Sequence, residues 1–399
     1  METVNQLLDS IKDVGRDDVR GGYSRAVYST PELDLREWFK EQAAQRGLGV
    51  ETDRNGIIWA WWGEPQDGAL VTGSHLDSVP GGGAFDGPLG VASALAAVDI
   101  LKSRGLQPGR SLAVTVFPEE EGSRFGVACL GSRLLTGAID AGKALNLRDV
   151  DGETFADVAR SNGLDPRHVG ADPEALARIG DFVELHVEQG KGLGQDGPAI
   201  AVGSSILGHG RWKISVSGQG NHAGTTLMED RADSMVAAAQ IVLAVRDTAA
   251  KQPDARATVG RLTPVPGGTN VIASRVDLWL DARHPDDAVT ARLIEAIYSA
   301  AQHVAAAENC SVTLTEESYS GTVHFDSALS RRIGGLLPDA PVLATGAGHD
   351  AGVLSAYVPS AMLFVRNPSG ISHSPEEYVG DEDASAGAVA LADVLEGLL

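Results

Sequence analysis

The sequence is poor in cysteine and in long hydrophobic runs. Its two cysteines, Cys129 and Cys310, lie far apart and form no CxxC pair, so we expect free, buried thiols in a reducing cytoplasm. There is no run of about 18 apolar residues, and the acidic N-terminal segment lacks the apolar core of a secretion signal. The composition therefore predicts a soluble protein of the cytoplasm and no membrane partner.

Positive charge is scarce as well. Lys and Arg number 32 against 54 Asp and Glu, which gives a formal net charge of -22 at pH 7. Such a chain repels nucleic acids and anionic membrane surfaces, so no nucleic-acid partner is expected. A small-molecule partner is the expectation that remains.

The chain is long enough for two domains. A length of 399 residues exceeds what one hydrophobic core usually serves. Residues 70–117 read as strand, Gly-rich loop, helix and strand, the order of a βαβ unit. We predict an α/β catalytic domain, formed by residues 1–208 and 323–399, with a mainly parallel or mixed sheet flanked by helices. Residues 209–322 show a βαββαβ order, which predicts an inserted ferredoxin-like α+β domain.

Side chains that bind metal ions occur at five separate places, each beside a strand-like run or among glycines. In open α/β sheets the ligand crevice lies beyond the C-terminal ends of the strands, where these residues fall. Singly, each has an ordinary explanation, such as a turn aspartate, a solvated acidic loop or a buried core histidine. Together they predict a two-metal hydrolase. The five places are His75, Asp86, Glu119–Glu121, His186 and His373.

The residue types in these places suit metal-assisted hydrolysis. His75 and Asp77 lie two apart on a predicted strand, so the Asp77 carboxylate is expected to orient the metal-binding imidazole. Asp86 has room in its Gly-rich loop to bridge two cations about 3.5 to 4 Å apart. Three consecutive carboxylates after a buried strand are costly unless a cation compensates them. One of them could bind a metal while its neighbour acts as general base on a water molecule.

An ordered set of motifs resembles the M20 metallopeptidase-type amidohydrolases, in the branch of allantoate amidohydrolases and N-carbamoyl-L-amino acid hydrolases. The resemblance implies that His75 and His186 bind one metal and that Glu121 and His373 bind the other. Asp86 would bridge the two ions. The motifs are GSHLDSVPGGGAFDGPLG, EEEGSRF, ELHVEQG, NHAGTT, GGTNVI, WLDARH, GAGHDA and GISHSP.

The resemblance also implies the cofactors and the reaction. Each subunit would hold two divalent ions, Zn²⁺ or, as in some members, Mn²⁺, Co²⁺ or Ni²⁺, and the mixed N and O ligand set does not choose among them. The ions would lower the pKa of a shared water, Glu120 would take its proton, and hydroxide would attack a ureido (N-carbamoyl) carbonyl. Hydrolysis of allantoate or an N-carbamoyl-L-amino acid, in purine or pyrimidine catabolism, would release ammonia and carbon dioxide.

Further residues are expected at the substrate. By the resemblance, the inserted domain would act as a lid and in dimerisation, and its His222 would contact the oxyanion from the partner subunit of a homodimer. Asn270 would also reach the substrate. Arg283 would grip a substrate carboxylate with its planar guanidinium. Gln189 would bind the ureido amide, because an amide side chain both donates and accepts hydrogen bonds.

The chain departs from the family pattern in two places. Relatives carry a carboxylate-binding arginine where Gly210 aligns here, and Arg366 and Asn367 replace a usual Pro-Ser pair. We hypothesise that Arg366 restores the lost positive charge, with His209 also reaching the pocket.

Alternative functions are a dipeptidase or aminoacylase of the same superfamily, or a non-catalytic binding protein that keeps the fold. The motifs NHAGTT, HVEQG and GAGHDA favour ureido cleavage over peptide cleavage. In the last motif, His349 and Asp350 either support the metal site or form a structural loop. The complete set of ligands, with Glu120, speaks against a binding protein.

Overall fold

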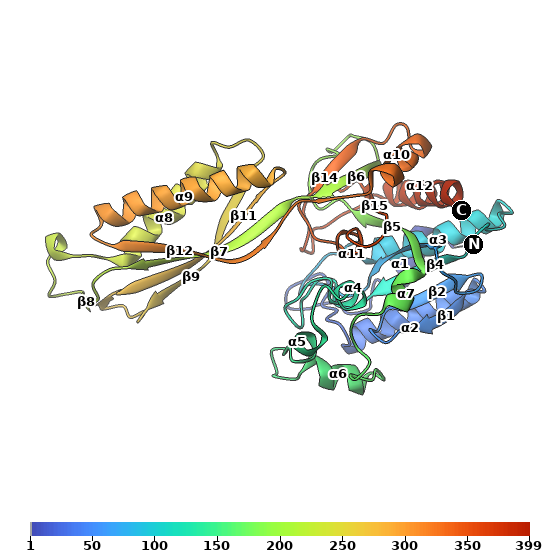
Figure 1. The fold of residues 1–399 in the computed structure, drawn as a ribbon, viewed down its shortest axis with the longest axis horizontal. Helices are drawn as coiled ribbons and strands as arrows, with labels where there is room; N and C mark the ends of the chain where they lie inside the picture. Colours follow the sequence, from blue (N-terminus) through green and yellow to red (C-terminus); the bar gives the residue numbers. More distant parts are fainter. Residues whose placement is uncertain (1) are drawn as a thin grey trace. The chain divides into compact units, whose positions relative to one another are not determined.

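The computed structural model describes residues 2–399, and the chain divides into two units (Figure 1). The first comprises Met1–Ser205 and His324–Leu399, and the second is Ile206–Val323. The sequence places these boundaries at residues 209 and 322. Within residues 2–399, no helix combines the length and the apolar character needed to cross a lipid bilayer.

The first unit is built on a mixed sheet of nine strands, counted over the described residues. Its centre is parallel, because β3 pairs with β4 and β5, and β5 pairs with β15 in the same direction. The flanking pairs are antiparallel. The predicted α/β class with a mainly parallel or mixed sheet is confirmed. In sheet order the strands are β1 (Gly49–Thr52), β2 (Ile58–Trp62), β4 (Leu112–Phe117), β3 (Ala69–His75), β5 (Ile179–Val187), β15 (Ser360–Val365), β6 (Ile200–Ile206) and β13 (Val323–His324), with β14 (Val342–Thr345) paired to β6.

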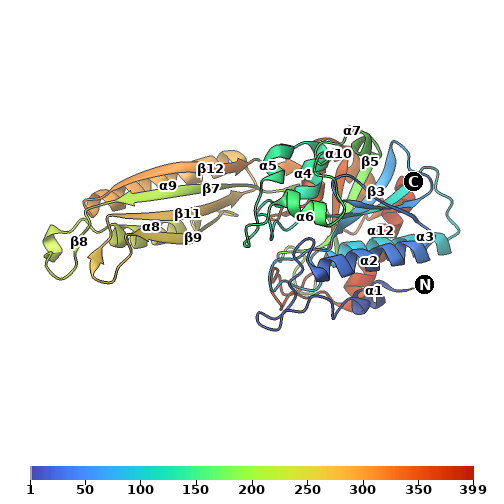
Figure 2. The same cartoon turned by 90° about the horizontal axis from the view of Figure 1, so that it is seen from below.

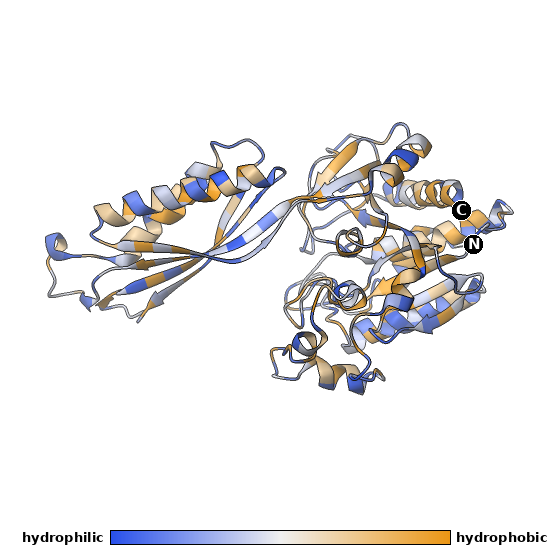
Figure 3. Ribbon diagram, in the orientation of Figure 1, coloured by the Kyte–Doolittle hydropathy of each residue, from blue (hydrophilic) through white to orange (hydrophobic). Residues whose placement is uncertain are grey.

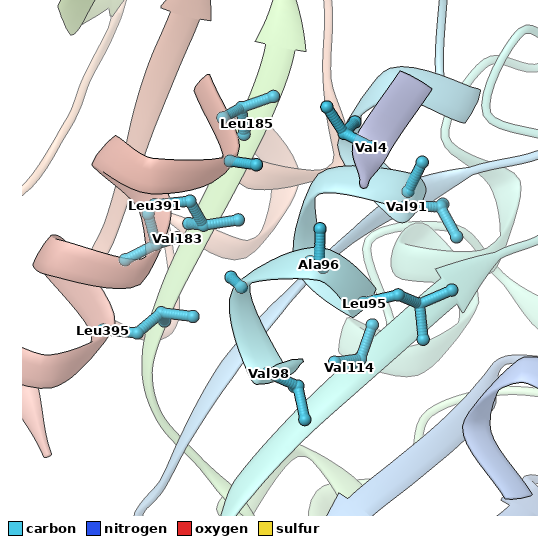
Figure 4. Close-up of a cluster of buried hydrophobic side chains, with 14 of the residues drawn as sticks. Val4, Val91, Leu95, Ala96, Val98, Val114, Val183, Leu185, Leu391 and Leu395 are labelled. Atoms are coloured by element: carbon cyan, nitrogen blue, oxygen red, sulfur yellow. The ribbon is translucent and has the colours of Figure 1, made fainter. Parts of the chain in front are cut away.

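The buried apolar side chains of this unit form two main hydrophobic clusters among the described residues. Helices α1, α3 and α12 pack on one another and on the central strands, and Leu95, Leu185 and Leu391 belong to the buried cluster that they form (Figure 4). A second cluster joins α4, α5 and α6 (Figure 2). The helices of this unit are α1 (Val4–Ser10), α2 (Thr30–Gln45), α3 (Pro88–Ser103), α4 (Leu130–Thr136), α5 (Ala141–Leu145), α6 (Phe155–Ser161), α7 (Pro173–Ala177), α10 (Ser327–Leu336), α11 (Asp350–Leu354) and α12 (Asp381–Leu398).

Helix α3 shows how the sequence sets up the site. Pro88 occupies its first turn, and Gly87 precedes it at φ 84°, a conformation that favours glycine. A Cβ atom on Gly87 would lie 2.6 Å from the His75 ring. The glycine therefore lets the loop that carries Asp86 pass close to the end of β3.

The second unit is a four-stranded antiparallel sheet covered by two helices, in the order βαββαβ. Helix α9 alternates hydrophobic and hydrophilic residues along its length (Figure 3), and its apolar residues pack on the sheet. This is the ferredoxin-like arrangement. Its elements are β7 (Gly208–Ser217), α8 (Ser234–Ala249), β9 (Arg256–Val265), β11 (Arg275–His284), α9 (Asp287–Ala307) and β12 (Ser311–Ser320), with the short strands β8 (Asn221–His222) and β10 (Val271–Ile272) and the 3₁₀ turn Met228–Asp230.

Candidate metal centre

The parallel centre of the sheet gathers the predicted metal ligands at one edge. His75 is the last residue of β3 and lies in register with Phe117, the last residue of β4, after which the acidic run begins. His186 is the penultimate residue of β5, in register with Phe364 on β15. Parallel strands end at the same edge of a sheet, so segments far apart in sequence deliver their side chains to one place.

One group of donor atoms consists of two histidines and an aspartate, all buried. Asp86 Oδ1 lies 3.4 Å from His75 Nε2 and 3.2 Å from His186 Nε2. The Nδ1 atom of His75 bonds the carbonyl oxygen of Asp77, and that of His186 bonds the carbonyl oxygen of Val187. Carbonyl oxygens only accept, so both Nδ1 atoms carry hydrogen, and in the neutral rings both Nε2 lone pairs point at Asp86.

The second group shares Asp86 through its other carboxylate oxygen. His373 Nε2 lies 3.4 Å from Asp86 Oδ2 and 3.3 Å from Glu121 Oε2. The His373 side chain is 51% exposed, in contrast to the buried first group. Within each group the donor atoms all lie within 4.8 Å of one another. One carboxylate between two sets of donors is the arrangement that a bridging ligand needs.

The electrostatics of this site suit bound cations. Burial opposes protonation of His75, but Glu120 and Asp86 outweigh it and raise the pKa of the ring well above its ordinary range. Burial, followed by the nearby Asp86, raises the pKa of Glu121 to about 8. The pocket thus favours positive charge among its donors, and two divalent cations would supply it. The residues present fit a two-metal centre.

Glu120 lies beside the donors and belongs to neither group among the described residues. Its Oε2 is 3.7 Å from His75 Nε2, and its Oε1 lies 3.4 Å from Sγ of the buried Cys129. Burial raises the pKa of Glu120 well above its ordinary range, and the carboxylates of Asp350 and Glu121 act in the same direction. Glu120 is therefore a carboxylate placed at the donors without occupying a donor position.

Asp77 acts differently from the prediction. The His75 ring is held by the backbone carbonyl of Asp77 at 2.9 Å, while the Asp77 carboxylate lies 3.7 Å away. That carboxylate instead accepts the backbone N–H groups of Glu120, at 3.2 Å, and Glu121, at 3.1 Å. The expected alternation fails because β3 ends at His75, so Asp77 is no longer on a strand. Asp77 thus links the His75 ring to the acidic run.

Two other predicted residues line the donor groups. The Gln189 amide donates to Asp86 Oδ2 at 2.9 Å and to Ser372 Oγ at 3.2 Å, and its own oxygen is buried with no partner within residues 2–399. The ring of His349 lies 4.4 Å from that of His186, centroid to centroid, and neither of its nitrogens has a partner in the described chain. Burial lowers the pKa of His349 well below its ordinary range, so the ring is neutral.

Arg366 is placed differently from the hypothesis based on the sequence. Its Nε and Nη2 atoms donate to Asp383 at 3.0 and 2.9 Å, and its Nη1 donates to the Gly197 carbonyl at 2.6 Å. Asp383 lies in the first turn of α12, so this arginine ties the end of β15 to that helix. Its charge is already balanced, which corrects the expectation that it replaces the arginine missing at Gly210.

Four predicted substrate residues belong to the second unit. Arg283 forms a two-point ion pair with Asp281, at 2.8 and 3.0 Å. His209 is partly buried, and burial together with Arg283 lowers its pKa. The exposed ring of His222 accepts the Gly224 N–H through Nδ1 at 3.1 Å. Asn270 is exposed, and its backbone carbonyl accepts a hydrogen bond from the Ala223 N–H at 3.0 Å. Their roles at a substrate stay predictions.

Sequence reasoning missed two buried carboxylates behind the donors. Glu184 accepts hydrogen bonds from the Ser74 hydroxyl at 2.9 Å and from the Ala351 N–H at 3.0 Å. Glu377 accepts bonds from the loop that carries Asp86. An acidic residue inside the apolar run DFVELHV was the available signal for Glu184. Nothing in the sequence distinguishes Glu377 from its neighbour Glu376.

The chain is similar to known proteins over most of its length. The model of peptidase family M20/M25/M40 matches residues 71–397. The chain is 33% identical to an N-carbamoyl-L-amino acid amidohydrolase of Geobacillus stearothermophilus, over 98% of this chain and 96% of that protein. It is 30% identical to an allantoate amidohydrolase of Escherichia coli strain K12, over 99% and 97% of the two chains. The structure of a hydantoinase/carbamoylase family amidase from Burkholderia multivorans matches with a TM-score of 0.87 at 31% identity, covering 98% of this chain and 96% of that one.

Proposed function

The chain belongs to peptidase family M20/M25/M40, and on that basis we propose that it hydrolyses the C–N bond of a ureido group. The proposed substrates are allantoate or an N-carbamoyl-L-amino acid, and the products are ammonia, carbon dioxide and the freed amine. The relatives named above carry these two activities, and the resemblance to their branch of the family is confirmed. The observation that carries the proposal is the pair of donor groups sharing Asp86, with Glu120 beside them.

Each donor group is assigned one divalent ion, Zn²⁺ first and Mn²⁺, Co²⁺ or Ni²⁺ as substitutes. When bound, two such ions lower the pKa of a water molecule and stabilise negative charge on the substrate oxygen. His75 and His186 would hold one ion and Glu121 and His373 the other, with Asp86 belonging to both donor groups. The carbonyl groups that bond the Nδ1 atoms of His75 and His186 fix the rings with Nε2 toward Asp86, where each Nε2 would be available to an ion.

Glu120 is assigned the proton transfers. Its Oε2 faces the donors and takes a proton from the attacking water, while its Oε1 is held by the thiol of Cys129. The backbone N–H of Glu120 is anchored by Asp77, which limits movement of the carboxylate. The same Oε2 then gives the proton to the departing nitrogen, which leaves as ammonia. The carbamate that remains on the other nitrogen then loses carbon dioxide and frees the amine. A carboxylate in this position suits both steps, because it can take a proton from the attacking water and give it to the departing nitrogen.

Further residues are proposed to contact the substrate. The buried, unpaired amide oxygen of Gln189 is suited to accept an N–H of the ureido group. We keep His222 as the oxyanion contact, supplied by the second subunit of a homodimer, and Asn270 and His209 as further contacts. Arg283 is kept as the proposed partner of the substrate carboxylate, which requires its guanidinium to leave or to share the ion pair with Asp281.

A substrate panel tests the activity. Metal-loaded enzyme is incubated with allantoate, N-carbamoyl-L-amino acids and N-carbamoyl-β-alanine, and ammonia is measured. An N-acetyl-L-amino acid and a dipeptide report the aminoacylase and dipeptidase alternatives. The proposal expects ammonia from a ureido substrate at a kcat/KM well above that for either amide. Hydrolysis of the amides alone, or of nothing in the panel, rejects it.

A further inference from the structure

Glu377 holds the backbone of the loop that carries Asp86. Its Oε1 accepts the N–H groups of Phe85 and Asp86, each at 3.0 Å. Glu377 is 4% exposed, so its carboxylate is shielded from water and these bonds have little competition from solvent. The two partners are separated from it by 292 and 291 residues, so the contact exists only in the folded unit.

The other carboxylate oxygen of Glu377 accepts a hydrogen bond from Ser372, the residue that precedes the predicted ligand His373. Ser372 Oγ donates to Glu377 Oε2 at 2.8 Å and lies 3.3 Å from Asp86 Oδ2. His373 follows Ser372 directly and has φ 55°, a left-handed conformation that costs energy outside glycine. One short loop therefore carries a ligand and also the carboxylate that holds the bridging ligand.

The Gly-rich loop is shaped to receive this carboxylate. A Cβ atom on Gly83 would lie 2.3 Å from Glu377 Oε1 and 2.5 Å from its Cδ, so only glycine fits there. Glycines also leave the loop many backbone conformations in the absence of a partner. A buried acceptor of two consecutive N–H groups selects one of those conformations.

We propose that Glu377 is a positioning residue, which fixes Asp86 between the two donor groups and couples the Asp86 loop to the His373 loop. The inference rests on the two-metal site of the proposed function. Without the hydrogen bonds to Glu377, the binding of metal must also order the Gly-rich loop. This cost lowers the affinity of both donor groups for metal, because Asp86 belongs to both. Residues that hold ligands in this way typically contribute about 10–100-fold to metal affinity.

The test compares Glu377→Ala and Glu377→Gln with Glu376→Gln. Glu376 is the adjacent exposed glutamate, and it bonds only the Ser374 hydroxyl among the described residues, so it is a matched control. Zn²⁺ affinity is measured by competition with a chelator in the absence of substrate. The visible spectrum of the Co²⁺-loaded proteins reports the coordination of the ions.

Glu377→Ala is expected to lose about 10–100-fold in Zn²⁺ affinity and to change the Co²⁺ spectrum. Glu377→Gln keeps an oxygen for the two N–H groups but places an amide against Ser372, so we expect a partial rescue. Glu376→Gln is expected to match the wild type. If Glu377→Ala does not fold, Glu377→Gln and Ser372→Ala decide, and each should still bind Zn²⁺ more weakly than the wild type.

Wild-type affinity and an unchanged Co²⁺ spectrum in the folded variants would overturn the inference. These readouts need no substrate, so they separate the inference from the assigned reaction. Weaker metal binding in Glu377→Ala, together with an inactive wild type in the substrate panel, would support the positioning role of Glu377 and reject ureido hydrolysis. Normal metal binding by the variants, together with ammonia release by the wild type, would reject the positioning role of Glu377 and support ureido hydrolysis.

Discussion

His75 and His186 present their Nε2 atoms to one another across 3.4 Å, and both atoms face the same oxygen of Asp86. Their Nδ1 hydrogens are committed to backbone carbonyls, so the two Nε2 atoms and a carboxylate converge in a buried space. A divalent cation bound by these donors stabilises the folded state, so the metal-free fold is expected to be less stable than the metal-bound one.

Removal of metal is therefore expected to lower thermal stability. For a site with free metal at about 100 times its Kd, the stabilisation is about 2.7 kcal/mol. Thermal unfolding of the protein treated with a chelator, and of the same protein after Zn²⁺ is restored, measures the difference. His186→Ala is the control, and its response to Zn²⁺ should be smaller, because only the second donor group remains intact. An identical Tm with and without Zn²⁺ in the wild type would contradict this expectation.

Glu120→Gln is expected to lower kcat by about 10²–10⁴-fold, because the amide cannot take the proton of the attacking water. KM and the metal content should stay close to the wild type, since Glu120 lies outside both donor groups of the described chain. Steady-state ammonia release and metal analysis measure these quantities. A variant with the wild-type kcat would assign the proton transfers to another group.

Asp77→Asn should weaken metal binding and activity by about 10–100-fold. The substituted amide offers one acceptor oxygen where the carboxylate accepts the N–H groups of both Glu120 and Glu121. Asp67→Asn, at an exposed aspartate, is the matched control and should behave as the wild type. Equal Zn²⁺ affinity and kcat in the two variants would show that the Asp77 carboxylate does not order the acidic run.

Arg366→Ala should leave KM unchanged and reduce the free energy of unfolding. Its hydrogen bonds to Asp383 are charge-assisted, and loss of such bonds costs about 1.5–3 kcal/mol. Urea unfolding measures the loss, and Asp383→Asn should cause a similar one. The double variant should then lose less than the sum of the two, because both act on one interaction. A rise in KM with unchanged stability would restore the carboxylate-binding role.

The sequence predicted features that depend on local pattern and on strand direction. Apolar runs ending at His75, at Phe117 and beyond His186 indicate parallel strands, and parallel strands must end together. The identity of a hydrogen-bond partner depends on tertiary packing instead. The ion pair of Arg366 with Asp383 could not be predicted from the sequence, because it depends on where α12 packs. The hydrogen bond from the Asp86 N–H to Glu377 could not be predicted either, because the two residues are 291 positions apart.

Metal analysis of the purified, Zn²⁺-loaded protein tests the two-metal centre most directly. We predict two Zn²⁺ ions per chain in the wild type. His373→Ala should retain one ion, because only the second donor group is broken. Asp86→Ala should bind both ions weakly, because its carboxylate belongs to both groups. A wild type that binds a single ion, or an Asp86→Ala variant that retains two with undiminished affinity, would contradict the shared centre on which the proposed function depends.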